Sequence, residues 1–365
     1  MSIQVALRLE KHPDGVWALA GDEAARFVLV DEFLAHLIDR NYSPKTVRSY
    51  GYDLLAFCRW LLEEEVELVQ VDVEVLLGFL RACRDAKVPG RPGPNVVTMS
   101  GRRLDQYAPA TINRRLAAIS ALFAFVVMRD PSVKNPVPKG KEARWITAGE
   151  RNGLLAHTRR RAKDRSSLRL REPRRLPTAL SQTEAAELLA SFKSWRDRAI
   201  AGLMLYSGLR SAEVLTLEVT DVDIGARWLK VIGKGRRERR VPLDADVASV
   251  IQVYLLTERP EPVDPGQRRL FLVAKGANRG QPLTPAGLRT IFRYHRSVSG
   301  VADGHPHALR HTFGTALAEA GVDLAVMQAL LGHAHVDTTA RYIHLAPAHV
   351  KAEFDAARTR QRDQS

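Results

Sequence analysis

Apolar side chains recur at helical spacing in the first third of the chain. Residues 25–39 follow this spacing, and a proline then interrupts it within "NYSPKT", which favours a new helix start at Pro44. The spacing continues to Glu64, returns from Val73 to Arg84, and fills "APATINRRLAAISALFAFVVMRD" after the loop "VPGRPGPN". The sequence therefore predicts four helices that form a small all-α domain.

Order restarts at "LPTALSQTEAAELLASF", where Ser181 and Glu184 stand three positions apart, the spacing of a capping box at a helix start. Further on, "RWLKVIGKGRRERRVPL" changes to strand-like periodicity on both sides of Gly233–Gly235, which predicts two strands joined by a tight turn. Helical patterns are expected from this hairpin to the end. We therefore expect a mainly α chain whose second domain is mixed α+β with a small antiparallel sheet.

A length of 365 residues favours two domains rather than one. We place an N-terminal extension at 1–24, a helical domain at 25–130, a linker at 131–179, and a second domain with a C-terminal tail at 180–365. The linker and the loop from Lys87 to Pro109 both interrupt the regular patterns.

The charge of the chain points to a polyanionic partner. The formal net charge is +14 and the pI is near 10.1, which is typical of nucleic-acid-binding proteins. From Pro131 to Leu180 the chain carries 14 basic and 4 acidic residues, so the excess is concentrated in the linker. A solvated, disordered connector would have a similar composition, and a flexible basic connector can also order on a phosphate backbone.

Cysteine usage and hydropathy favour a soluble, intracellular protein. The first thirty residues lack the apolar run of a signal peptide, and no stretch reaches about 18 consecutive apolar residues. Cys58 and Cys83 have no metal-ligand spacing and lie in apolar helical segments, so we expect them to be buried as ordinary hydrophobic side chains.

Several motifs carry candidate chemistry. The Gly233-Lys234-Gly235 turn lacks the pattern of a phosphate-binding P-loop, so ATP is not implied; a lysine at a hairpin tip is either solvated or inserted next to a DNA phosphate. The histidines that cluster in "HPHALRHTFGTALAEAG" are candidate metal ligands, but the positive charge of Arg310 would repel a cation there. Arginine and histidine donors suit an anion instead, and Tyr342 downstream is then a candidate nucleophile.

Arg210 follows the end of an apolar helix in "LMLYSGLRSAEVLTLEVTD", with Glu213 one turn later. The two residues could form an ordinary surface pair that contributes little. Alternatively, Glu213 holds the guanidinium of Arg210 in one orientation, as a preorganised charge clamp requires.

Four blocks together resemble the signature of the tyrosine recombinases, the phage integrase family of DNA strand-exchange enzymes. They are "SGLRSAEVLTL", "VIGKGRRERRVPL", "HALRHTFGTALAEAG" and "LLGHAHVDTTARYIH", in this order and spacing. The preceding four-helix segment is similar to the family's SAM-like core-binding domain. The resemblance implies a catalytic domain in the second half of the chain, with an active site of Arg210, Lys234, His307, Arg310, His333 and Tyr342.

In enzymes of this family the tyrosine attacks a DNA phosphate, forms a 3′-phosphotyrosyl link and releases a 5′-hydroxyl that later attacks a partner strand, without ATP, metal or cofactor. The two arginines would stabilise charge on the phosphate oxygens, and Lys234 would protonate the departing 5′-oxygen. His307 would relay the tyrosine proton and His333 would donate to a phosphate oxygen. A phenol with an ordinary pKa near about 10 needs such positive neighbours to react at neutral pH.

The expected partner is double-stranded DNA, bound by a homotetramer on two paired sites, in the cytoplasm at the nucleoid and with no role for a membrane. The function implied is a recombinase or integrase, as of a mobile element; the alternatives are a type IB-like topoisomerase and a DNA-binding regulator that does not cleave. The C-terminal tail would dock on a neighbouring subunit or on its own domain. Candidate DNA-contacting residues are Lys45, Arg48, Arg114, Arg115, Arg159, Arg160, Arg161 and Arg236.

Overall fold

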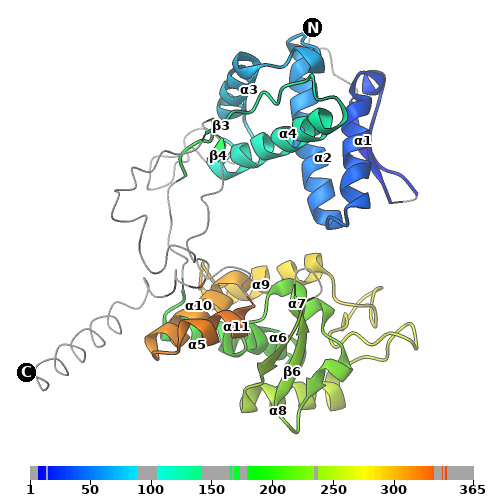
Figure 1. Cartoon of the computed structure of the whole chain (residues 1–365). Coiled ribbons are helices and arrows are strands. Elements are labelled where there is room, and N and C mark those ends of the chain that lie inside the picture. Colours follow the sequence, from blue (N-terminus) through cyan, green and yellow to red (C-terminus); the bar gives the residue numbers. More distant parts are fainter. Residues whose placement is uncertain are drawn as a thin grey trace, which may run out of the picture. The chain divides into compact units, whose positions relative to one another are not determined.

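The chain divides into two compact units, Met1–Pro173 and Arg174–Ser365 (Figure 1). The computed structural model describes residues 7–13, 15–88, 105–140, 165–166, 168–172, 179–233, 237–332, 339 and 342. Each unit has its own hydrophobic core, and each is described separately below.

The first unit contains the four predicted helices. A 3₁₀ turn at Ala24–Phe27 leads into α1 (Val28–Asp39), followed by α2 (Pro44–Glu63), α3 (Val73–Asp85) and α4 (Pro109–Arg129), with a second 3₁₀ turn at Leu68–Gln70. Side-chain caps fix two of the starts: Ser43 accepts from the backbone N–H of Thr46, and Asp72 accepts from that of Val75. These predictions are confirmed to within a few residues.

The core of this unit lies where α1, α2 and α3 pack on α4. Cys58 and Cys83 are both buried in it, as expected. Among the described residues, α4 is the one helix whose length and mean hydropathy would let it cross a membrane. It is also a core helix, since Ile112, Leu116, Ile119 and Leu122 are buried in the core of the unit and the helix packs on α1, α2 and α3.

Residues 1–24 contribute a β-hairpin that the sequence did not predict. Strand β1 (Arg8–Lys11) pairs antiparallel with β2 (Trp17–Ala20), and the hairpin packs against α1 and α2. Arg59 on α2 donates from Nε and Nη2 to the carbonyl oxygen of Leu7, at 2.9 and 2.6 Å. Each strand has only four residues, too few for the alternation of strands to stand out from the sequence. A shorter antiparallel pair, β3 (Lys139–Gly140) with β4 (Arg165–Ser166), lies within the predicted linker.

The second unit begins with α5 (Gln182–Ser191), α6 (Trp195–Tyr206) and α7 (Ser211–Thr216). The predicted capping box is present, because Ser181 Oγ accepts from the N–H of Glu184 while Glu184 accepts from the N–H of Ser181. A three-stranded antiparallel sheet follows in the order β5-β6-β7, with β5 at Val222–Asp223, β6 at Trp228–Ile232 and β7 at Glu238–Pro242. The expected hairpin around Gly233 is therefore confirmed.

From Ala245 to Leu331 this unit is mainly helical. Helix α8 (Ala245–Val253) continues as a π-helical turn at Tyr254–Glu258, and α9 (Pro285–Ser299), α10 (Pro306–Glu319) and α11 (Leu324–Leu331) follow. The chain was expected to be helical after the hairpin, but residues 259–284 form no helix; Arg269 makes an isolated bridge to Glu218, and Leu272 makes one to Pro282. Pro260, Pro262 and Pro265 explain the difference, because proline lacks the N–H that an internal helical position donates. The core is built around α6, which contacts α8 and α10.

A buried histidine joins three helices of this core. His295 of α9 is 5% exposed; its Nδ1 lies 3.0 Å from Ser191 Oγ and its Nε2 lies 4.0 Å from Asp197 Oδ2. Burial lowers the pKa of His295 and outweighs the opposing attraction of Asp197.

The stability of the second unit should therefore depend on pH through His295. Its folded-state pKa lies below its unfolded-state value of about 6.5, so the stabilisation is fully present above that value and is lost as the pH falls through the folded-state pKa. Urea unfolding between about pH 5 and 8 should show this loss. The His295→Gln variant should give a flatter curve, and an equally steep one would contradict the assignment.

Candidate active site

Arg210 is placed by a tight change of direction between α6 and α7. Gly208 has φ +63°, a left-handed conformation, and a Cβ at this position would lie 2.3 Å from the ring of Phe313. Arg210 then occupies the N-cap of α7, where its own N–H donates to Glu213 Oε2 and its Nη1 donates to Glu213 Oε1, both at 2.8 Å. The expected contact between Arg210 and Glu213 is therefore present, and the carboxylate fixes both the backbone and the guanidinium of Arg210.

Arg310 of α10 is almost completely buried, with 4% exposure. Its guanidinium donates to the carbonyl oxygens of Gly208 and Leu331, and its Nη1 lies 3.9 Å from Glu213 Oε2. Burial, followed by the positive charge of Arg210, lowers the pKa of Arg310 to about 10. Arg310 is still protonated at neutral pH and brings a positive charge into a largely dehydrated site.

Arg239 of β7 is a third arginine at this site, and the sequence reasoning missed it. Its Nη1 and Nη2 donate to Glu213 Oε1 and Oε2, both at 2.9 Å, and its Nε donates to the carbonyl oxygen of Leu330 at 3.1 Å. A usable signal was present, because strand residues alternate between faces and Arg239 stands two positions before the buried Val241. That spacing places Arg239 on the inner face of the hairpin.

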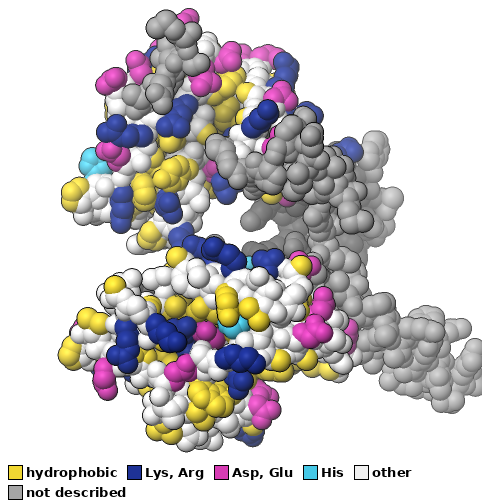
Figure 2. All heavy atoms as spheres, turned by 180° about the vertical axis from the view of Figure 1, so that it is seen from behind, with side chains coloured by type: hydrophobic (Ala, Val, Ile, Leu, Met, Phe, Trp, Pro, Cys, Tyr) yellow, Lys and Arg dark blue, Asp and Glu magenta, His cyan; other side chains and the backbone are white. Residues whose placement is uncertain are grey.

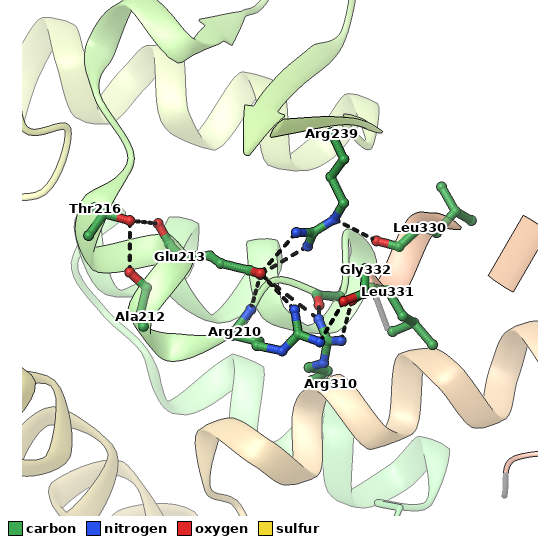
Figure 3. Close-up of polar contacts among 10 residues, drawn as sticks. Arg210, Ala212, Glu213, Thr216, Arg239, Arg310, Leu330, Leu331 and Gly332 are labelled. Atoms are coloured by element: carbon green, nitrogen blue, oxygen red, sulfur yellow. Dashed lines mark hydrogen bonds and ion pairs between the residues drawn. The ribbon is translucent and has the colours of Figure 1, made fainter. Parts of the chain in front are cut away.

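The C-terminal end of α11 meets all three arginines (Figure 3). Its last carbonyl oxygens, from Leu330, Leu331 and Gly332, each accept from one guanidinium, respectively that of Arg239, Arg310 and Arg210. Gly332 ends the helix with φ +60°, as expected for a glycine C-cap. The carbonyl groups at a helix C-terminus carry partial negative charge, so the arginines also stabilise this helix end.

Glu213 is the single carboxylate among these arginines within the described residues. It is 4% exposed. Burial alone would raise its pKa, but hydrogen bonds from Arg239 and from the N–H of Arg210 outweigh burial and hold the pKa below its usual value. One negative charge therefore faces three positive charges, and the excess favours binding of an anion such as phosphate.

Tyr342 is buried beside α10, with 2% exposure. Its hydroxyl lies 2.9 Å from His311 Nδ1, and its ring packs so closely on Gly314 that a Cβ there would lie 2.6 Å from the phenol. The ring belongs to a small apolar cluster with Ala318, Met327 and Leu331. The phenol is thus held by a histidine, but the histidine in contact is His311 rather than His307.

His307 lies one helical turn before His311 on α10, and the two rings stack with centroids 6.2 Å apart. Partial desolvation lowers the pKa of His307 below its usual value. The neighbouring His305 and the positive charges of Arg310 and Arg210 act in the same direction on the pKa of His307. A neutral His307 can accept a proton at pH 7, and the four-residue spacing of the two histidines was the available signal for His311.

Other predicted residues lie outside this site or outside the described residues. Lys234, His333, Arg236 and the linker arginines Arg159, Arg160 and Arg161 are not among the residues that the structure describes. Lys45, Arg48, Arg114 and Arg115 belong to the first unit.

Those four residues of the first unit have different surroundings. Lys45 is exposed at the start of α2. Arg48 is exposed and lies over the rings of Trp17 and Tyr52, at 5.7 and 5.4 Å.

Farther along, Arg114 forms a two-pronged pair with the buried Asp53, at 2.7 and 3.0 Å, while half of its side chain stays exposed. Arg115 is half-buried, lies 4.0 Å from the Tyr107 ring centroid and donates to Cys83 Sγ. Its contacts favour a structural role.

The sequence reasoning also missed a basic face on α9. Arg289, Arg293 and Arg296 are exposed and recur at the spacing of one helical face. Within the described part of the chain none of them pairs with a carboxylate, and α9 contains no acidic residue. Basic side chains gather in several places on the second unit (Figure 2).

Both units match models of known protein families. The model of the phage integrase family matches residues 178–349, and that of the phage integrase N-terminal SAM-like domain matches residues 30–92. The resemblance drawn from the four sequence blocks and the SAM-like assignment of the first unit are thereby confirmed.

Relatives match over nearly the whole chain. The tyrosine recombinase XerD of Lacticaseibacillus casei is 29% identical over 338 residues, covering 89% of this chain and 97% of the relative. The tyrosine recombinase XerC of Mycobacterium bovis BCG is 30% identical over 345 residues, covering 90% of this chain and 97% of the relative. Among solved structures, a Tn1549 transposon integrase in complex with transposon right end DNA superposes with a TM-score of 0.60 at 16% identity, covering 90% of this chain and 98% of the other. The XerH recombinase bound to a palindromic difH substrate superposes with a TM-score of 0.59 at 22% identity, covering 86% of this chain and 80% of the other.

Removing the charge of Glu213 should destabilise the second unit. Glu213→Gln leaves buried guanidiniums without a counter-charge, and we expect the free energy of unfolding to fall by about 3 kcal/mol. This value is at the lower end of the range for breaking a buried ion pair, because a third of the Arg210 side chain is exposed. Glu238→Gln is the matched control, since Glu238 is exposed and 3.8 Å from Lys230, and should change stability by less than about 0.5 kcal/mol. Equal effects in urea unfolding would contradict the central role of Glu213.

Proposed function

This chain belongs to the phage integrase family of tyrosine recombinases, enzymes that cleave and rejoin DNA, and we propose that it is a site-specific recombinase acting through a 3′-phosphotyrosyl intermediate. The observation that carries the proposal is the arrangement of Arg210 and Arg310 around Glu213 and the end of α11, beside a tyrosine held by a histidine. A DNA-binding regulator has no need of a nucleophile beside an anion site.

In the proposed step the hydroxyl oxygen of Tyr342 bonds to a DNA phosphorus and the bond from that phosphorus to the 5′-oxygen breaks. Lys234 donates the proton that the departing oxygen takes, and His311, whose Nδ1 lies 2.9 Å from the phenol oxygen, accepts the phenol proton. His307, to which the resemblance assigns the proton relay, stacks on His311 and is proposed to assist it. Arg210 and Arg310, with His333, stabilise the charge on the non-bridging oxygens. The phosphodiester energy stays in the tyrosyl link, so the reaction consumes no ATP.

Tyr342 must move before it reacts. With 2% of its side chain exposed and its hydroxyl on His311, the phenol reaches a DNA phosphate only after it leaves the cluster around Gly314. We propose that DNA binding supplies the free energy for this movement, so that cleavage is coupled to occupation of the site.

The DNA partner is supported by basic surface in both units. On the second unit the α9 face of Arg289, Arg293 and Arg296 offers phosphate-binding groups, and on the first unit Lys45 and Arg48 are exposed on α2. The linker arginines are proposed to follow the backbone of the duplex. We further propose a homotetramer on two paired sites, acting on DNA in the cytoplasm at the nucleoid, as an integrase of a mobile element.

Covalent trapping tests the nucleophile. A nicked duplex bearing a site selected from random DNA by binding should give a covalent protein–DNA adduct with the wild type and none with Tyr342→Phe. Tyr206→Phe, an exposed tyrosine at the end of α6, should form the adduct at the wild-type rate. An adduct with Tyr342→Phe would contradict the assignment. Exchange between two sites on one plasmid then separates a recombinase from a topoisomerase, which would only relax it.

Substitution of the α9 arginines tests the DNA-contacting face. Each of Arg289→Ser, Arg293→Ser and Arg296→Ser should weaken binding and reduce the slope of log affinity against log salt concentration by about 1 where a phosphate contact is lost. Arg268→Ser, an exposed arginine outside α9, is the charge-matched control and should keep the wild-type slope. An unchanged slope in all three α9 variants would refute this face as a phosphate contact.

A further inference from the structure

One side chain of β7 contacts three separate segments of the second unit. Arg239 is 13% exposed and lies against α7 through Glu213, against the end of β6, and against the last turn of α11. Each of these segments leads directly to a residue proposed for catalysis.

The contact with α7 fixes the partner of Arg210. Both terminal nitrogens of Arg239 bind the two oxygens of Glu213, each at 2.9 Å, in the fork geometry that orients a carboxylate most strongly. Glu213 Oε1 in turn accepts from Arg210 Nη1 at 2.8 Å. The direction in which Glu213 holds Arg210 is therefore set by Arg239.

This contact also has an electrostatic effect. A two-pronged pair between Arg239 and Glu213 is neutral as a whole, so it cancels the carboxylate charge that would otherwise offset Arg210. Arg210 and Arg310 can then act on a phosphate with their full positive charge. Arg239 thus raises the charge available at the anion site, while its own Nε, Nη1 and Nη2 donate to Leu330 and Glu213.

The contact with β6 lies at the hairpin turn. A Cβ on Gly233 would lie 3.5 Å from Arg239 Nη1 and 3.7 Å from Glu213 Oε1, so the Arg239–Glu213 pair packs directly on this glycine. The N–H of Gly233 donates to the carbonyl oxygen of Arg237 at 2.8 Å and closes the base of the turn. Gly233 immediately precedes Lys234 in the sequence.

The contact with α11 lies at its C-cap. Arg239 Nε donates to the Leu330 carbonyl oxygen at 3.1 Å, and the guanidinium lies flat on Gly332, where a Cβ would be 2.9 Å from both Cζ and Nη1. Gly332 immediately precedes His333. A side chain at position 332 would displace Arg239, which adds a steric reason for glycine there besides its positive φ.

We propose that Arg239 is a positioning residue for DNA cleavage: it sets Arg210 through Glu213, and it holds the two backbone points from which Lys234 and His333 depart. The inference rests on the proposed function, because it assigns Arg239 to the same reaction. Misplacement of reacting groups by about 1 Å can cost about 100-fold in rate, so loss of Arg239 should slow cleavage without weakening DNA binding.

The test compares Arg239→Met with wild type on two nicked duplexes under single-turnover conditions. One duplex has the natural 5′-oxygen at the cleaved bond, and in the other sulfur replaces that oxygen, because a thiolate departs without a general acid. We expect Arg239→Met to form the adduct about 100-fold more slowly on oxygen, with DNA affinity within about twofold of wild type. On sulfur the deficit should shrink at least about tenfold, since the contribution of Lys234 is bypassed.

Two further variants make the result specific. Arg239→Lys keeps the charge but has neither the fork nor the Nε–H, so its rate should fall between those of Arg239→Met and wild type, and it carries the test if Arg239→Met fails to fold. Arg240→Met removes the same charge from the neighbouring, exposed position of β7 and should cleave like wild type.

The outcomes separate the two proposals. No adduct from the wild type would overturn the proposed function itself. A wild-type adduct with an unchanged rate in Arg239→Met, an equal deficit on oxygen and sulfur, or a deficit explained by weaker DNA binding would each overturn the positioning role while leaving the proposed function intact.

Discussion

The buried carboxylate of Glu213 is the interaction on which the proposed active site depends. It accepts from the backbone and side chain of Arg210 and from both arms of Arg239, and it lies 3.9 Å from Arg310. A desolvated carboxylate is stable only when its hydrogen bonds and counter-charges are in place, and removing a partner from such a site is far more costly than removing an exposed one. The stability of this unit and the geometry of its anion site are therefore parts of one network.

The same network supplies hydrogen-bond donors to the carbonyl oxygens at the end of α11. The final carbonyls of a helix have no partner within the helix, and here Leu330, Leu331 and Gly332 each obtain one from an arginine. In return, the helix end holds the three guanidiniums close together despite their mutual repulsion. Segments distant in the sequence, from α7, β7, α10 and α11, are thereby locked into a single arrangement before any phosphate arrives, and such preorganisation is what favours a transition state over the ground state.

Tyr342 packs beside this network, on α10 and Leu331. Its ring lies in a small cluster of apolar side chains, and its hydroxyl is satisfied by His311. In the proposed mechanism the charged groups that bind the phosphate are therefore already in position, whereas the nucleophile is buried and must move before it reacts. Such an arrangement suits the proposed coupling of DNA cleavage to DNA binding.

The sequence by itself determined the four helices of the first unit, the Ser181 capping box, the hairpin around Gly233 and the family, because these follow from local periodicity, caps and motif spacing. It also supplied the contact between Arg210 and Glu213, which are three residues apart. Only the tertiary structure placed Arg239 on Glu213, His311 on Tyr342, and Arg115 on Cys83. These contacts join residues 26 to 32 positions apart in the sequence, and no local pattern states which of several arginines or histidines will meet a given partner once the chain has folded.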